Sequence, residues 1–180
     1  DKYYTKIEVE EEMVLDIHNN WHSFEDYISD LRKKYKNKVK KIVRLTNQLE
    51  IRVLDAKNID DYYIEMQNLF NQVVQSSSFM GPEFNVNSFA FFVKKDLIKV
   101  NGYFLNNKLI AFSSEIIDDK ILYSYYVGFD KKLNKTFPIY GRILIDNIVN
   151  AIALKKDKLI LGRTANEYKS NFGAYPNKSY

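Results

Sequence analysis

The sequence predicts an α/β fold in which an antiparallel meander is followed by a strand–helix–strand unit. Three consecutive runs rich in β-branched and aromatic residues, at 98–105, 108–117 and 121–129, predict the meander. Pairs of Asn or Asp residues separate these runs, as in tight hairpin turns. A helical pattern at 138–154 and a short apolar run at 159–161 follow. Because a crossover of this length joins strands that point the same way, the strands at 121–129 and 159–161 should run parallel.

The composition is that of one domain, or of one complete lobe of a larger protein. The 180 residues are 46% hydrophobic, which is ample for a core. The chain has no cysteine, so disulfides, thiolate metal sites and cysteine nucleophiles are excluded. That composition is compatible with the cytoplasm, the location that we predict. No apolar run approaches the roughly 20 residues needed to span a bilayer, so no transmembrane segment is expected. His18 and His22 have no evident third ligand, so no metal site is predicted.

The N-terminal part reads as extended segments over 5–17, followed by one long helix from Ser23 to about Arg44. Apolar residues recur along that helix at spacings of three, four and seven, which indicates a buried seam. Between Arg32 and Arg44 the chain has no acidic residue, and basic residues fill the other face: Arg32, Lys33, Lys34, Lys36, Lys38, Lys40, Lys41 and Arg44. Two interpretations remain open for the basic helix 32–44, a solvated face or a surface for a polyanion.

Before the meander, the sequence predicts a strand at 49–55 and two further helices. The first helix should be capped by Asn58 or Asp60 and continue to Val74, and the second should lie within 85–96. The polar segment 76–87 between them is either a substrate loop or a simple connection.

The stretch from Leu159 to Pro176 carries the densest set of polar candidates. Its strand should end at Gly162, and Thr164 with Glu167 has the spacing of a capping box. The helix should run to about Phe172 and stop at Gly173, which can take positive φ. On such a helix Arg163, Glu167 and Ser170 share one face at the strand tip, where open α/β sheets bind ligands. The alternative is a capped, salt-bridged turn without function.

Lys169 does not belong to that face if the segment is helical. Two residues along a helix is a rotation of about 200°, so Lys169 would point away from Glu167. In an extended segment the two side chains would lie on the same side. The sequence leaves this choice open.

Several of these motifs resemble one branch of a known family. Gly162-Arg-Thr-Ala-Asn-Glu-Tyr-Lys-Ser170, followed by Gly173-Ala, is similar to the signature near the end of the FemAB-like, peptidoglycan-biosynthesis-like branch of GNAT-fold acyltransferases. The segment from Trp21 to Tyr35 resembles the long basic helix of that branch. Tyr126-Val-Gly-Phe-Asp130, with Asn134 and Tyr140 after it, resembles the central strand and its turn. The resemblance implies a mixed sheet with an antiparallel meander, a splayed parallel strand pair that holds the acyl thioester, and helices on both faces.

The resemblance also implies a domain organisation and a reaction. Residues 1–47 would be an extended segment and basic helix leading from a first lobe that precedes this chain, and residues 48–180 the acyltransferase domain. The reaction would be N-acyl transfer from acyl-CoA or acetyl-CoA to an amine on a small molecule, peptide or lipid precursor. The basic helix 32–44 would then face CoA phosphates, an anionic surface or tRNA. The alternatives are a Fem-type peptidyltransferase that uses aminoacyl-tRNA, and a GNAT-like lobe that binds without catalysis.

Catalytic roles follow from the same resemblance. Tyr168-Lys169-x-x-Phe172-Gly173 resembles the Phe-Lys-x-x-Phe-Gly segment of Fem enzymes, in which the Lys is thought to stabilise developing negative charge. This assigns that role to Lys169 and leaves Glu167 as the general-base candidate. Arg163 is a fixed cation suited to a carboxylate or phosphate.

The remaining candidates surround the expected thioester gap. The helix N-terminus between Asn134 and Gly141 is a natural anion site, to which Lys135 adds a cation. Ordinary GNAT enzymes carry a Gln/Arg-x-x-Gly-x-Gly/Ala pyrophosphate loop at this point, of which this chain has only Gly141. The predicted binding set therefore comprises these residues: Thr164, Asn134, Lys135, Tyr140, Gly141, Tyr126 and Gly173. Tyr125, Tyr126 and Tyr140 could position substrate or protonate the leaving group.

Overall fold

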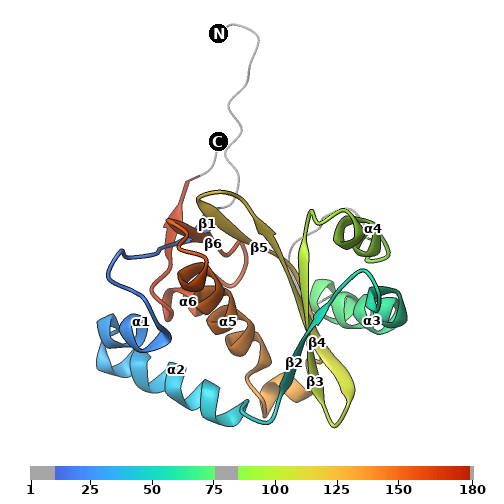
Figure 1. Cartoon of the computed structure of the whole chain (residues 1–180). Helices are drawn as coiled ribbons and strands as arrows, with labels where there is room; N and C mark the ends of the chain where they lie inside the picture. The colour runs from blue at the N-terminus through green and yellow to red at the C-terminus, as the bar shows by residue number, and fades with distance from the viewer. Residues whose placement is uncertain (1–10, 76–84, 179–180) are drawn as a thin grey trace, which may run out of the picture.

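The computed structural model describes residues 11–75 and 85–178, which form one seven-stranded sheet with helices against both faces (Figure 1). The strand order is β2-β3-β4-β5-β6-β1-β7. The strands are β1 (Glu12–Asp16), β2 (Glu50–Leu54), β3 (Lys99–Leu105), β4 (Lys108–Ile117), β5 (Ile121–Phe129), β6 (Lys158–Ile160) and β7 (Tyr175–Asn177). The helices are α1 (Phe24–Asp30), α2 (Lys33–Leu45), α3 (Tyr63–Val74), α4 (Ser88–Lys94), α5 (Ile139–Ala153) and α6 (Asn166–Ser170), with 3-10 turns η1 (Ile59–Tyr62) and η2 (Leu133–Lys135).

The predicted meander is confirmed. β3, β4 and β5 pair antiparallel in sequence order. Asn106 and Asn107 both have positive φ, 50° and 64°, as the tight turn between β3 and β4 requires. Asn tolerates this conformation better than most residues because its short side chain bonds locally.

The predicted parallel pair is also confirmed, whereas its splaying stays a prediction. β5 and β6 run parallel in register from Ile121 with Lys158 to Tyr123 with Ile160. Beyond Tyr123, β5 continues to Phe129 without further pairing to β6 in the described chain. Pairing therefore covers the whole of β6, which ends at Ile160, but only the first three residues of β5.

Two layers of helices cover the sheet. α1, α2 and α5 enclose the largest core cluster together with β1 and β6, and α3 and α4 cover β2, β3 and β4 from the other side (Figure 1). Neighbouring residues of β4 point to opposite faces, since Phe112 packs with α3 and α4 and Ala111 packs with α5. This arrangement confirms the expected fold class.

The single long helix predicted from Ser23 to Arg44 is wrong. Ser23 does cap the helix start, because its Oγ accepts a hydrogen bond from the Asp26 amide at 3.2 Å. The backbone then becomes extended at Leu31 and Arg32 (ψ 141° and 144°), which ends α1 and starts α2. The break lets the two helices meet different partners: in α1 the Tyr27 hydroxyl reaches the Phe172 carbonyl, and α2 packs on α5.

The N-terminal segment is part of the same sheet and core as the rest of the described chain. β1 lies between β6 and β7 and pairs antiparallel with both. α1 and α2 contribute Tyr27, Ile28, Val39 and Ile42 to the largest core cluster. That a first lobe precedes this chain stays a prediction.

Other local expectations have mixed outcomes. Neither Asn58 nor Asp60 caps α3, because η1 precedes that helix and Tyr62 stands at its N-cap; Asn58 Oδ1 accepts instead from the Asp55 amide. Most of the candidate substrate loop, residues 76–84, lies outside the described residues. Among residues 11–75 and 85–178, no helix is long and apolar enough to cross a membrane.

Candidate active site

The tip of β6 is shaped by two residues with left-handed backbone. Gly162 has φ 74° and Ala165 has φ 57°, and α6 begins only at Asn166. The predicted capping box is therefore wrong, because Ala165 rather than Thr164 precedes the helix and no side chain caps it. The chain reverses between β6 and α6 within these few residues. A Cβ built on Gly162 would meet nothing within 4 Å, so the glycine is required by its backbone angle and borders open space.

Lys169 is buried at this tip. Only 2% of the residue's surface is exposed, and its Nζ donates a hydrogen bond to the carbonyl oxygen of Gly162 at 3.0 Å. The same carbonyl accepts from the Met13 amide of β1 at 2.9 Å. Burial lowers the pKa of Lys169 from 10.5 to about 8, and the charge of Glu12 partly opposes this effect. A lysine held this way is a typical functional-site signal.

Glu167 points the other way. Because α6 is helical, Lys169 turns away from Glu167, as expected for the helical alternative. Glu167 is exposed, and its backbone carbonyl accepts from the side chains of Ser170 and Asn171. The two candidates thus occupy opposite sides of one five-residue helix.

Arg163 does not join Glu167 on a helical face. Because α6 starts at Asn166, Arg163 lies in the bend before it, and the predicted shared face with Glu167 and Ser170 is wrong. Within the described ranges, no ion pair links Arg163 to Glu167, so the salt-bridged turn is not formed either. Arg163 and Thr164 are both exposed at the strand tip.

An aromatic stack packs beside Lys169. The Tyr168 ring stacks on Tyr140 with centroids 5.6 Å apart, and Tyr140 stacks on Phe129 at the end of β5, also at 5.6 Å. Lys38 of α2 places its Nζ 4.7 Å from the centre of the Tyr168 ring. Burial raises the pKa of both Tyr140 and Tyr168, so both hydroxyls stay protonated at neutral pH.

The N-terminus of α5 is largely satisfied from inside the protein. Asn134 Oδ1 accepts from the Tyr140 amide at 2.9 Å, and the Ile139 amide donates to the Phe137 carbonyl at 2.6 Å. A Cβ on Gly141 would stand 2.6 Å from the Tyr168 hydroxyl and 2.8 Å from Ile42 Cδ1. Close packing against α2 and α6 thus explains Gly141, and the hydrogen bond to the Tyr140 amide explains Asn134. Both leave less space and fewer free amides for an anion at this helix end. Lys135 is exposed in η2.

A β-bulge lies where β5 leaves β6. The β4–β5 register shifts between Ser113 and Glu115, so that Ser114 lies opposite both Tyr125 and Tyr126. Ser114 Oγ accepts from the Tyr126 amide at 2.9 Å and donates to the Tyr126 carbonyl at 2.8 Å. The bulge puts both tyrosines on the face covered by α3 and α4, where each ring packs near Phe89.

The structure therefore divides the predicted site residues into groups. Lys169, Tyr140, Gly141 and Asn134 lie on the side of α2, α5 and α6, whereas Tyr126 lies across β5 among α3 and α4. Gly173 has φ 92° after α6 and ends that turn, as predicted. Sequence reasoning missed Ser114, although the Ser113-Ser114 pair inside an apolar strand was a signal, and it missed the contact of Lys38 with Tyr168.

Comparisons with known proteins agree with this architecture. The sequence matches no protein-family profile and no curated protein. Among solved structures, FemX matches with a TM-score of 0.67 and 8% identity over 95% of this chain and 60% of its own. The C-terminal domain of a putative lysylphosphatidylglycerol synthetase from Agrobacterium fabrum matches with a TM-score of 0.60 and 10% identity, over 96% and 59%. A predicted acetyltransferase from Clostridium acetobutylicum, solved with acetyl-CoA, matches with a TM-score of 0.51 and 14% identity, over 69% and 88%.

The fold is that of the GNAT acyltransferases. The neighbours that cover nearly all of this chain include FemX, in keeping with the FemAB-like arrangement expected from the motifs. This chain spans about 60% of the length of FemX.

Proposed function

We propose that this protein transfers an acyl group from a thioester to an amine, with the reacting centre at the tip of β6. The observation that carries the proposal is the buried ammonium group of Lys169, held against the Gly162 carbonyl at the tip of β6. Acetyltransferases and Fem-like proteins share this fold, which supports acyl transfer in general. The donor that we propose is acyl-CoA or acetyl-CoA, and the acceptor is an amine on a small molecule, peptide or lipid precursor.

Lys169 would stabilise the oxyanion. The acceptor nitrogen attacks the thioester carbonyl carbon, and the carbonyl oxygen takes the negative charge of the tetrahedral intermediate. A nearby ammonium lowers the energy of that charge most in a dry environment, which burial of Lys169 provides. With a pKa of about 8, Lys169 is mainly charged at pH 7, as this role requires.

The other candidates take roles on the exposed side. Because Glu167 lies on the opposite side of α6 from Lys169, it would accept through intervening water the proton that the amine loses as the C–N bond forms. The C–S bond then breaks, and the released thiolate takes a proton from water or from a tyrosine near the tip of β6. Arg163, exposed before α6, would hold a carboxylate or phosphate of the substrate.

Turnover tests this proposal directly. The chain has no cysteine, so thiol release from acetyl-CoA can be followed with a thiol reagent without background from the protein. A panel of amines, including amino sugars, peptides and phospholipid headgroups, should contain at least one that accelerates thiol release and yields an amide detected by mass spectrometry. Amine-independent release, or none with any thioester, would contradict the proposal.

One observation favours a second candidate, a lobe that binds without catalysis or takes its acyl group from aminoacyl-tRNA. The first turn of α5 is closed by Asn134 and by the packing of Gly141, where a CoA-dependent GNAT enzyme would receive pyrophosphate. Turnover with an aminoacyl-tRNA and not with acetyl-CoA would favour the tRNA-dependent reaction. Binding of either donor without turnover would favour the non-catalytic lobe.

A further inference from the structure

We propose that the outer face of α2 binds the phosphate groups of the acyl donor, in place of the helix end that serves ordinary GNAT enzymes. This inference rests on the proposed function, since it concerns the donor of that reaction. The cations of α2 take no part in the proposed acyl transfer. Their ligand would be a molecule that carries several phosphate esters.

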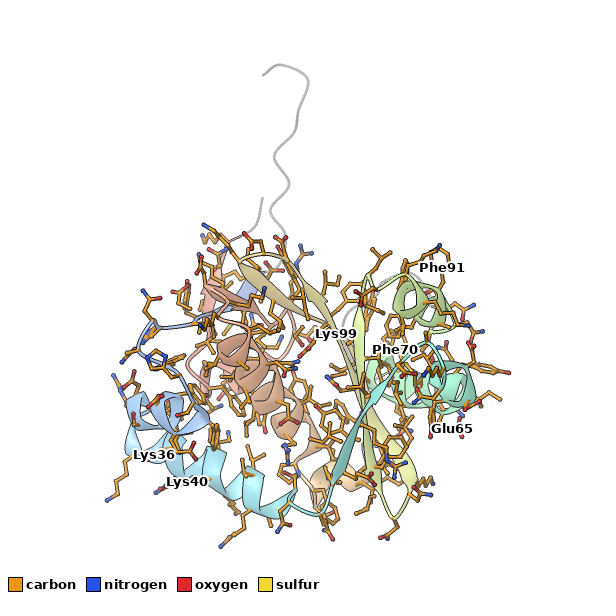
Figure 2. The ribbon with its side chains drawn as sticks, viewed as in Figure 1. Lys36, Lys40, Glu65, Phe70, Phe91 and Lys99 are labelled. Carbon is orange, nitrogen blue, oxygen red and sulfur yellow. The ribbon has the colours of Figure 1, made fainter. Side chains whose placement is uncertain are left out.

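The charge of α2 is uncompensated. From Arg32 to Arg44 the chain has eight cationic residues and no acidic one. In the part of the chain that the structure describes, none of these cations takes part in an ion pair. Figure 2 shows Lys36 and Lys40 extending from α2 away from the body of the protein. Among the described residues, these cations therefore lie on α2 without salt bridges, and Lys38 instead contacts the Tyr168 ring.

The placement of three of these cations works against the helix. Lys33, Lys34 and Lys36 occupy the first two turns, where the helix dipole favours negative charge, and α2 has neither an acidic residue in its first turn nor a side-chain cap. α1 follows the opposite rule, with Ser23 as its cap and Glu25 and Asp26 in its first turn. Positive charge placed where it weakens the helix points to a role outside folding.

The outer face is hollowed at one point. Asn37, Lys40, Lys41 and Arg44 surround a depression of about 250 Å³. Their spacing of three, four and seven residues places them on one exposed stripe of the helix. Three cations and one amide around a shallow hollow fit a phosphate group, because each can donate hydrogen bonds to its oxygens.

The same helix reaches the candidate active site. Lys38 lies over the Tyr168 ring, and Tyr168 is the chain neighbour of Lys169. A donor whose phosphates lie along α2 could therefore extend its acyl end past Lys38 toward the tip of β6. The α5 end offers less, because Asn134 and Phe137 already satisfy two of its amides.

Two donors carry the required chemistry, CoA with its phosphorylated nucleotide and tRNA with its phosphodiester backbone. Binding of CoA and of deacylated tRNA should be measured at 50 and 200 mM salt by calorimetry. The variant is K40Q/K41Q/R44Q, and the matched control is K95Q/K108Q/K120Q, which removes three exposed lysines outside α2.

We expect the α2 variant to bind at least one of the two probes tenfold or more weakly than the wild type. For tRNA, the slope of the logarithm of the binding constant against the logarithm of the salt concentration should also decrease in magnitude by about one for each cation removed. The control should bind as the wild type does. Loss with CoA would identify a nucleotide thioester as donor, and loss with tRNA alone would identify a nucleic acid.

Equal binding by the α2 variant and the wild type would overturn the inference, as would equal weakening in both triple variants or no binding of either probe. Acetyl-N-acetylcysteamine, a thioester without phosphates, separates this inference from the proposed function. Its turnover should be unchanged in the α2 variant. If no thioester turns over but phosphate binding is lost only in the α2 variant, then the proposed function fails while the phosphate surface stands.

Discussion

The Nζ atom of Lys169 lies 3.0 Å from the carbonyl oxygen of Gly162, and the Met13 amide donates to that same oxygen. One carbonyl at the end of β6 thus links the strand β1 to the inward side of α6. Lys169 gains a single hydrogen bond there and loses almost all contact with water.

Replacing Lys169 by methionine should not destabilise the protein. A pKa lowered from 10.5 to about 8 means that burying the charge costs about 3 kcal/mol at neutral pH. The lost hydrogen bond contributes about 1 kcal/mol, and the Gly162 carbonyl keeps the Met13 amide as donor. K169M should therefore be as stable as the wild type, or more stable by up to about 2 kcal/mol, in urea unfolding. A loss above about 1 kcal/mol would mean that Lys169 has a structural role, for example with Glu12.

The stability of the wild type should depend on pH through Lys169. Because the pKa is lower in the folded state, the unfolded chain binds more protons between pH 8 and 10.5. The contribution of Lys169 to stability is therefore lowest at pH 7 and rises as pH increases through that window. Subtracting the curve of stability against pH measured for K169M removes the contribution of the tyrosines, which titrate in both proteins. A difference that is flat, or that falls with rising pH, would contradict the buried charge.

The orientation of Lys169 could be predicted only in part from the sequence. The helix period predicted that Lys169 would turn away from Glu167, but only if the segment was helical, which local sequence did not decide. The capping signal at Thr164 was overridden because the reversal between β6 and α6 needs left-handed backbone at Gly162 and Ala165. Burial of Lys169 depends on β1, which comes from the other end of the chain.

Features of the fold that depend on local interactions were mostly predicted correctly, and several features that depend on residues distant in the sequence were not. The meander was predictable because alternation and Asn-Asn turns act within a hairpin. The break at Leu31–Arg32 has no glycine or proline to signal it and reflects the different partners of α1 and α2. The bulge at Tyr125 and Tyr126 depends on Ser114 of the adjacent strand, and the insertion of β1 between β6 and β7 pairs residues more than 140 positions apart.

Two adjacent serines on β4 should respond differently to alanine. Ser114 makes two hydrogen bonds to the backbone of Tyr126 at the bulge, so S114A should destabilise the protein by about 1–3 kcal/mol. Ser113 is equally buried, but its Oγ faces the buried Tyr103 hydroxyl and makes no hydrogen bond to the described backbone, so S113A should cost less than S114A. Thermal unfolding of both variants checks this. Equal losses in the two variants would argue against a special role of Ser114 at the bulge.

The packing at Gly141 predicts a second pair of variants. G141A would force its Cβ to within 2.6 Å of the Tyr168 hydroxyl and 2.8 Å of Ile42, costing about 1–3 kcal/mol. Removing the hydroxyl with Y168F should recover part of that loss, since only the Ile42 contact remains. A double-mutant cycle in urea measures this coupling. Additive effects of G141A and Y168F would show that the Tyr168 hydroxyl of α6 does not pack against Gly141 of α5.

The most direct test of the acyltransferase proposal is thiol release by the wild type, K169M, K169R and the exposed-lysine control K120M, each with its best amine acceptor. If Lys169 stabilises the oxyanion, kcat should fall at least a hundredfold in K169M while folding stability is kept, in line with the loss of an oxyanion donor. K169R should recover part of the rate because it restores the charge, and K120M should match the wild type. Wild-type turnover in a stably folded K169M would contradict the assignment of Lys169.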